Sequence, residues 1–131
     1  MLAGGAAKVA MLSFSTNGSA AHERVSKVVE ATRLAHAADP ELLIDGELQF
    51  DTAFVEAVSA SKAPNSALHG EANVFVFPNL DAANISLGIV RTMMDALHVG
   101  PILLGAAMPA HVLSTSVTSR GVVNMAALAV V

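Results

Sequence analysis

The sequence predicts an α/β fold in three layers, with helices on both faces of a mostly parallel sheet. Short apolar runs alternate along the chain with segments whose apolar residues recur at helical spacing, which is the pattern of βαβ units. The apolar runs show no polar alternation, as is typical of strands covered by helices on both faces. The chain has 131 residues, 53% of them hydrophobic, and this is enough to bury a domain-sized core.

The first 40 residues predict a strand followed by a helix. Residues 8–14 form a short apolar run that ends at the turn-forming residues 15–19, a pattern typical of a buried strand. Residues 21–38 place apolar side chains at helical spacing, with charged side chains on the opposite face. Pro40 ends this helix, because the residue before a proline is disfavoured in the helical region.

The next segment predicts a second strand and a second helix. Residues 42–45 form the strand, and Gly46 opens a turn. Asp51 is a suitable cap for a helix that runs to about Lys62. The capping box is incomplete, because Phe54, and not a glutamate, lies three residues after Asp51.

The second half of the chain predicts two further strand–helix pairs. Residues 73–77 (NVFVF) are rich in β-branched and aromatic side chains and give the clearest strand. A turn and a helix that ends near Asp95 follow, and residues 100–105 (GPILLG) predict a fourth strand. The polar residues around Ser114 then lead into a last helix.

Composition excludes several classes of function. The formal net charge is −4 and Lys and Arg are not clustered, so we expect no nucleic-acid partner. The apolar runs are shorter than the ~20 residues of a membrane-spanning helix, and no basic segment of a signal peptide precedes them, so we expect a cytoplasmic protein with no membrane partner. Cysteines are absent and the five histidines lack metal-ligand spacing, so we expect no metal. The chain stops inside an apolar stretch, and we expect a fragment.

Candidate binding residues follow the predicted strands, because ligands of open α/β sheets bind outside the carboxyl ends of the strands. The substrate-binding candidates are Ser15, Thr16, Gly18, Ser19, Asp45, Gly46, Gln49 and Asn79. Residues 15–19 form either a nest for a phosphate group or a plain turn between strand and helix. Capping and turn roles remain the alternative for Asp45 and Asn79.

Several segments together resemble one known family. "VAMLSFSTNGSA", "LLIDGELQFDTAFV", "GEANVFVFPNLDAANI" and "GPILLG" follow in the order and spacing of the phosphate acetyl/butyryltransferase (phosphotransacetylase) family, C-terminal portion. The resemblance implies a homodimer with two α/β domains per chain, in which residues 1–104 form the second domain and residues 105–131 return to the first. It implies acetyl-CoA and phosphate as substrates, acetyl phosphate and CoA as products, and no cofactor besides acetyl-CoA or CoA as substrate or effector.

The same resemblance identifies a catalytic corner that is altered in this chain. Ser114 matches the family serine, whereas Thr115 stands at the position of an arginine and Gly121 at that of the catalytic aspartate. A threonine supplies no charge to the developing oxyanion, and a glycine supplies no base. Arg120 and His111 lie nearby in sequence and are candidates to compensate. The alternatives are that Ser114 caps or turns the chain and that Arg120 is a solvated helix residue.

The catalytic candidates are therefore Ser114, Thr115, Arg120 and His111, with Ser116 and Thr118 expected only to cap the last helix. Residues 99–131 also resemble the phosphotransacetylase-like domain of bacterial malic enzymes. The leading hypothesis is a phosphate acyltransferase-family protein with an altered catalytic corner. The alternative is a non-catalytic domain of an NADP-dependent malic enzyme that senses acetyl-CoA.

Overall fold

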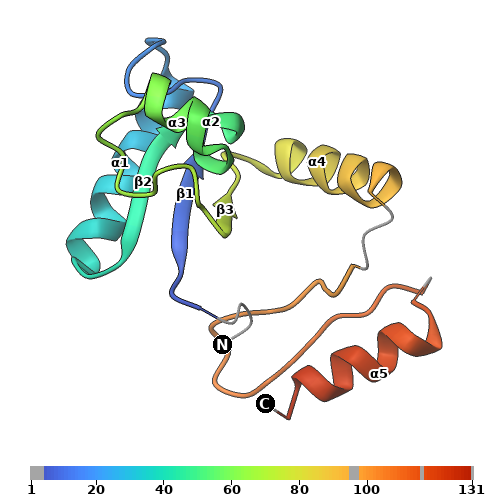
Figure 1. Ribbon diagram of the computed structural model, residues 1–131. Helices are drawn as coiled ribbons and strands as arrows, with labels where there is room; N and C mark the ends of the chain where they lie inside the picture. Colours follow the sequence, from blue (N-terminus) through green and yellow to red (C-terminus); the bar gives the residue numbers. More distant parts are fainter. Residues whose placement is uncertain (1–4, 95–97, 116, 131) are drawn as a thin grey trace. The chain divides into compact units, whose positions relative to one another are not determined.

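The computed structural model describes residues 5–94, 98–115 and 117–130 (Figure 1). The chain divides into two compact units, Met1–Ser86 (unit 1) and Leu87–Val131 (unit 2), and the boundary falls inside helix α4 (Leu80–Met93). The predicted domain division between residues 104 and 105 stays a prediction.

Unit 1 is built on a parallel sheet of three strands in the order β2-β1-β3. Strand β1 (Lys8–Leu12) lies in the centre, between β2 (Leu43–Leu48) and β3 (Val74–Val76). The chain passes from β1 to β2 on one side through helix α1 (Glu23–Ala38) and later returns to β3 on the other side of β1. The strands β1 and β3 therefore flank a topological switch point, where open α/β sheets bind their ligands.

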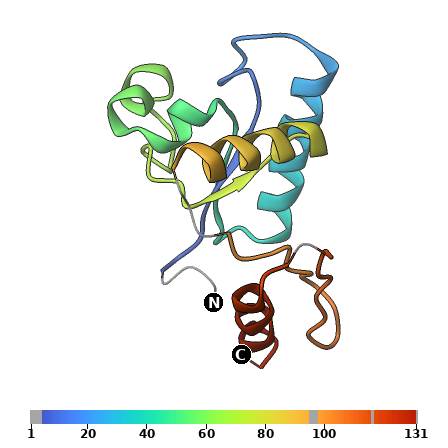
Figure 2. The same ribbon diagram turned by 90° about the vertical axis from the view of Figure 1, so that its right-hand side faces the viewer.

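Helices cover both faces of this sheet, so the predicted α/β class is confirmed. Figure 2 shows α1 on one side of the sheet and the short helices α2 (Phe50–Phe54) and α3 (Glu56–Lys62) on the other. On one face Ala10 and Leu12 belong to the main core. The other buried members of that core are Leu48, Ala53, Ala63, Leu68 and Ala72.

The opposite face of β1 packs towards α1. Val9 points away from Ala10 because successive side chains of a strand alternate between faces. Val9, Val25 and Val28 are all buried, and α1 contacts both β1 and β2. Val25 and Val28, two of the apolar residues at helical spacing that predicted α1, are thus the residues that it buries, whereas Val29 is exposed.

Two predicted boundaries around β2 are wrong. The strand does not stop at Gly46 but continues to Leu48, with Gly46 paired to Met11 of β1. The helix expected over residues 51–62 is broken at Val55, which is extended. The carbonyl of Ala53 accepts a hydrogen bond from the Ala72 N–H at 3.0 Å, so a tertiary contact replaces the continuing helical bond.

The predicted fourth strand is also wrong, since residues 100–105 lie in a loop. Gly100 and Gly105 have φ of +143° and +82°, which are not strand values. Pro101 lacks a backbone N–H with which to pair. An apolar run bounded by two glycines was the only signal for this strand, and it does not distinguish a strand from an apolar loop.

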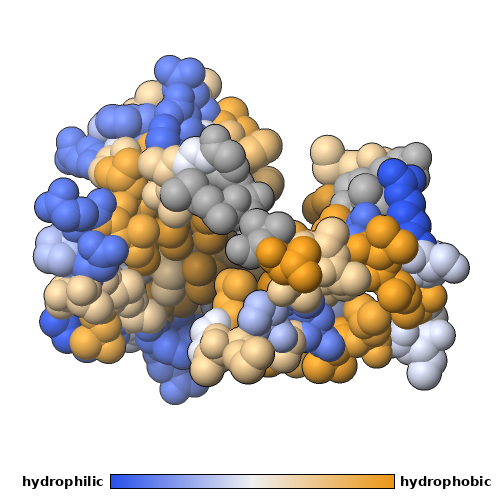
Figure 3. All heavy atoms as spheres, turned by 90° about the horizontal axis from the view of Figure 1, so that it is seen from below, coloured by the Kyte–Doolittle hydropathy of each residue, from blue (hydrophilic) through white to orange (hydrophobic). Residues whose placement is uncertain are grey.

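Unit 2 exposes much of its apolar surface. Helix α4 buries none of its residues, and α5 (Ser119–Leu128) buries only Met125. Met93, Leu104 and Met108 are each more than 70% exposed. Figure 3 shows hydrophobic residues, in orange, at the surface among hydrophilic ones. Within the described part of the chain, no helix has both the length and the apolar character needed to cross a membrane.

The close approach of β1 and β2 predicts that Gly46 cannot be replaced by alanine without loss of stability. Its φ is +155°, and an added Cβ would lie 2.5 Å from the Cβ and 2.7 Å from the carbonyl oxygen of Met11. We expect Gly46→Ala to lower the free energy of unfolding by roughly 2–4 kcal/mol in urea denaturation. Gly18→Ala is the matched control: its φ is +78° with no atom within 4 Å, so it should cost about 1 kcal/mol. Equal, small losses in both variants would contradict this interpretation of Gly46.

Candidate functional site

A buried carboxylate organises the loop that follows β1. Glu47 is only 4% exposed, and its Oε1 accepts hydrogen bonds from the Ser15 hydroxyl at 2.8 Å and the Gly18 N–H at 2.7 Å. The Asn17 N–H also donates to the backbone carbonyl of Glu47 at 3.2 Å. A buried carboxylate is costly unless it is hydrogen-bonded, so these bonds fix the loop against the end of β2.

The hydroxyl groups of the same loop bond mainly to one another and to the backbone. Ser19 Oγ accepts from the Thr16 N–H at 3.0 Å and lies 3.2 Å from Ser15 Oγ, which in turn accepts from the Ala20 N–H at 3.1 Å. Ser15 and Thr16 are buried, whereas Gly18 and Ser19 are exposed. The structure therefore brings the four predicted loop residues together, and ligand contact by them stays a prediction.

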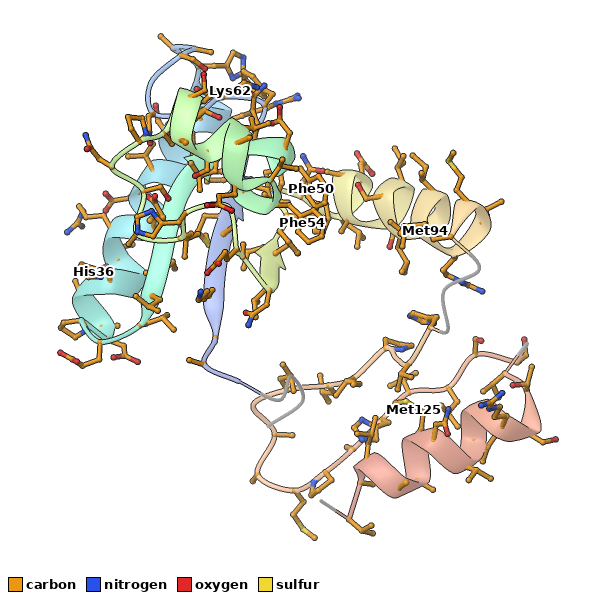
Figure 4. All side chains as sticks on the ribbon, viewed as in Figure 1. His36, Phe50, Phe54, Lys62, Met94 and Met125 are labelled. Atoms are coloured by element: carbon orange, nitrogen blue, oxygen red, sulfur yellow. The ribbon has the colours of Figure 1, made fainter. Side chains whose placement is uncertain are left out.

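Gln49 joins this loop to the start of α2. Its backbone N–H donates to Thr16 Oγ1 at 2.9 Å, and its Oε1 accepts from the Thr16 hydroxyl and from Lys62 Nζ, each at 3.3 Å. Lys62, labelled in Figure 4, also donates to Asp51 Oδ2 at 2.8 Å. This hydrogen bond from Lys62 holds the pKa of the Asp51 carboxyl below its ordinary value.

Asp45 and Gly46 lie within β2, before its carboxyl end. Asp45 pairs with Ala10 of β1, and its Oδ1 accepts the Gly46 N–H at 2.8 Å. Both residues are half-buried. Ligand contact by these two residues stays a prediction, while the observed local role of Asp45 is to accept a neighbouring N–H.

A cavity of about 600 Å³ lies at the switch point between β1 and β3. We call it the switch-point cavity. Its lining comes from the end of β1, from the residues that follow β1 and β3, from α1, from the start of α2 and from the first two turns of α4. They are Leu12, Ser13, Phe14, Arg24, Lys27, Phe50, Phe77, Pro78, Asn79, Asp81, Ala82 and Ser86. All of them belong to unit 1, and the volume is within the range of ligand pockets, about 300–1,000 Å³.

Asn79 is the one predicted binding residue that lines this cavity. Its Oδ1 accepts a hydrogen bond from the Ala82 N–H at 2.9 Å, so its expected capping role is confirmed. Arg24 and Lys27 were not predicted as site residues, because the helical pattern places them on the solvated face. Arg24 itself gave a signal: a cation in the first turn of a helix opposes the helix dipole, which indicates a role other than stabilising the helix.

Ser114 lines a second cavity, of about 370 Å³, within unit 2. We call it the Ser114 cavity. Other residues around it include Arg91, His98, Thr118, Gly121 and Asn124. Thr118 caps α5 by accepting the Gly121 N–H at 3.1 Å, as expected, and Ser116 lies outside the described residues.

The other catalytic candidates are not among the residues that line the Ser114 cavity. Thr115 is exposed, and Arg120 is exposed in the first turn of α5. His111 has two buried ring nitrogens, neither of which has a hydrogen-bond partner among the described residues. Within the same part of the chain, no group of three His, Asp or Glu side chains is placed to hold a metal ion. The catalytic roles of these residues stay predictions.

The hydrogen bonds to Glu47 predict that two substitutions of this residue lower the free energy of unfolding by different amounts. Glu47→Ala removes the acceptor that the Ser15 hydroxyl and the Gly18 N–H share, so we expect a loss of roughly 2–4 kcal/mol in the free energy of unfolding. Glu47→Gln keeps a carbonyl oxygen and should lose about half as much. Urea denaturation measures both. If Glu47→Ala were as stable as the unchanged chain, the carboxylate would not organise the loop.

The comparisons with known proteins agree with this architecture. Residues 1–130 match the family Phosphate acetyl/butaryl transferase. The chain is 57% identical over 124 residues to the NAD-dependent malic enzyme of Rhizobium meliloti, a match that covers 95% of this chain and 16% of that enzyme. It is 49% identical over 119 residues to the phosphate acetyltransferase of Bacillus subtilis, covering 91% of this chain and 37% of that enzyme.

A solved structure is also similar to this chain. The EutD phosphotransacetylase from Staphylococcus aureus matches with a TM-score of 0.90 and 45% sequence identity, over 94% of this chain and 38% of that chain. This chain thus corresponds to a minor part of the length of each of these relatives. The family match over almost every residue, on a sheet of the same architecture, leads to one conclusion: the chain belongs to the phosphate acetyl/butaryl transferase family.

Proposed function

We propose that this chain binds acetyl-CoA as a regulatory ligand and does not transfer the acetyl group. The observation that carries the proposal is the space around Gly121, at the position that the family resemblance gives to the catalytic aspartate. An added Cβ there would lie 2.8 Å from Val117 Cγ2 and 3.4 Å from Thr118 Oγ1. An aspartate would therefore require the Val117 methyl group to shift, and the chain supplies no carboxylate at this position.

The charges around Ser114 support the same proposal. Attack of phosphate on a thioester develops negative charge on the carbonyl oxygen, and a fixed cation beside it stabilises the transition state. Thr115 stands where the resemblance expects an arginine, and Arg120 is not among the residues that line the Ser114 cavity. Loss of a single electrostatic donor typically costs on the order of 10²–10³ in rate. The 57% identity to an NAD-dependent malic enzyme agrees with the resemblance to the malic-enzyme domain, for which a sensing role is the expectation.

A second candidate function is phosphate acetyl transfer itself, with acetyl-CoA and phosphate as substrates. It is favoured by the position of Ser114 beside a cavity that Arg91 and His98 also line, because these side chains offer a cation and an imidazole. The 49% identity to a phosphate acetyltransferase supports it too. Under either function, the homodimer and the cytoplasmic location stay predictions.

Two readouts on one sample separate the two functions. Equilibrium dialysis with labelled acetyl-CoA measures binding, and a thiol reagent measures release of CoA in the presence of phosphate. We expect saturable binding of acetyl-CoA and no release of CoA above the protein-free rate. Phosphate-dependent release in proportion to protein concentration would establish the second function, and absence of binding would contradict both.

We expect the arginine and aspartate of the family to restore activity at Thr115 and Gly121 only if the Val117 side chain is also made smaller. We expect Thr115→Arg with Gly121→Asp to release little CoA, because the Cβ of the new aspartate would lie 2.8 Å from Val117 Cγ2. Adding Val117→Ala removes the Cγ2 atom and should raise the rate by roughly tenfold or more over the double variant. The matched control is Val117→Ala alone, which should stay inactive. If the double variant were already as active as the triple one, the overlap at Gly121 would not matter.

A further inference from the structure

The switch-point cavity combines charged and aromatic groups that the altered corner around Ser114 does not explain. We propose that it binds a nucleotide, with the phosphates on Arg24 and Lys27, the base on the exposed phenylalanine rings and the ribose hydroxyls on Asp81. All five side chains used in this argument line the one cavity, and all belong to unit 1.

Two cations face this cavity without an acidic partner. Arg24 and Lys27 lie one turn apart on α1, and neither forms an ion pair among the described residues. Lys27 Nζ donates to the carbonyl of Pro78 at 2.6 Å, which holds the ammonium group at the turn between β3 and α4. In a chain of net charge −4, a pair of cations without carboxylate partners is suited to a phosphate group.

Aromatic rings line the same cavity. Phe14 is 55% exposed and Phe50 is 53% exposed, although fully apolar rings of this size are usually buried. Phe50 is held by Phe54 and Phe75, with ring centroids 5.4 and 5.2 Å away, and Figure 4 shows Phe50 beside Phe54. A fixed, half-exposed ring is a platform on which a nucleobase stacks.

The lining also includes a carboxylate, which suits a sugar and not a second phosphate. Asp81 lines the cavity in the first turn of α4. A carboxylate repels phosphate but accepts hydrogen bonds from ribose hydroxyls, as acidic residues do in dinucleotide sites at strand ends. Cations, aromatic rings and a carboxylate in one cavity therefore match the three parts of a nucleotide.

Two ligands carry these three chemical groups: a free adenosine nucleotide and the nucleotide end of acetyl-CoA. Only binding of the second rests on the proposed function. Calorimetric titration of the full chain with ADP, with adenosine 3′,5′-bisphosphate, with acetyl-CoA and with acetyl-pantetheine, which lacks the nucleotide, distinguishes them. The variants are Arg24→Gln and Phe14→Ala, since both side chains are exposed and thermal unfolding shows whether the fold is kept. The control is Arg33→Gln, on the same helix and paired with Glu30 outside the cavity.

We expect Arg24→Gln to weaken nucleotide binding by about tenfold or more, and Phe14→Ala by about tenfold, with no change in Arg33→Gln. If the variants weaken the binding of acetyl-CoA in the same way and leave the binding of acetyl-pantetheine unchanged, the nucleotide end of CoA occupies the cavity. If they weaken only the binding of ADP, the ligand is a free nucleotide. The inference is overturned if no nucleotide binds or if Arg24→Gln leaves every affinity unchanged. Acetyl-CoA that still binds in that case leaves the proposed function intact.

Discussion

The Glu47 carboxylate is the constraint on which the carboxyl edge of the sheet in unit 1 depends. It is buried, and its charge is accommodated because Ser15 and Gly18 donate hydrogen bonds to it. These bonds tie the loop after β1 to the last residues of β2, and the loop leads directly into α1. The chain then reaches His22, whose Nδ1 accepts the Arg24 N–H at 3.1 Å and so caps α1 just before Arg24 and Lys27.

The two cavities differ in the groups that line them. The switch-point cavity combines two cations with aromatic rings, and the proposed nucleotide binding rests on these groups. The Ser114 cavity is lined by a serine and by the capped start of α5, but Gly121 offers no carboxylate there. This difference underlies the proposal of a sensing role in place of turnover.

Sequence reasoning predicted the parts of the fold that depend on local periodicity. The valines of α1 and the β-branched run of β3 gave elements within two residues of those observed. The predicted boundaries are wrong where tertiary contacts determine where an element ends. The break at Val55 depends on a hydrogen bond from distant Ala72, and Gly46 continues a strand because β1 approaches it closely. Arg24 was missed because a helical pattern reports which face is polar, not which cavity that face borders.

Under the proposed function, the chain binds acetyl-CoA without cleaving its thioester. Carbon NMR of acetyl-CoA labelled at the carbonyl carbon, recorded with the protein in phosphate buffer, tests binding and cleavage in one spectrum. We expect a thioester signal that broadens or shifts with added protein and keeps its full intensity over time. Growth of an acetyl phosphate signal in proportion to protein concentration would contradict it.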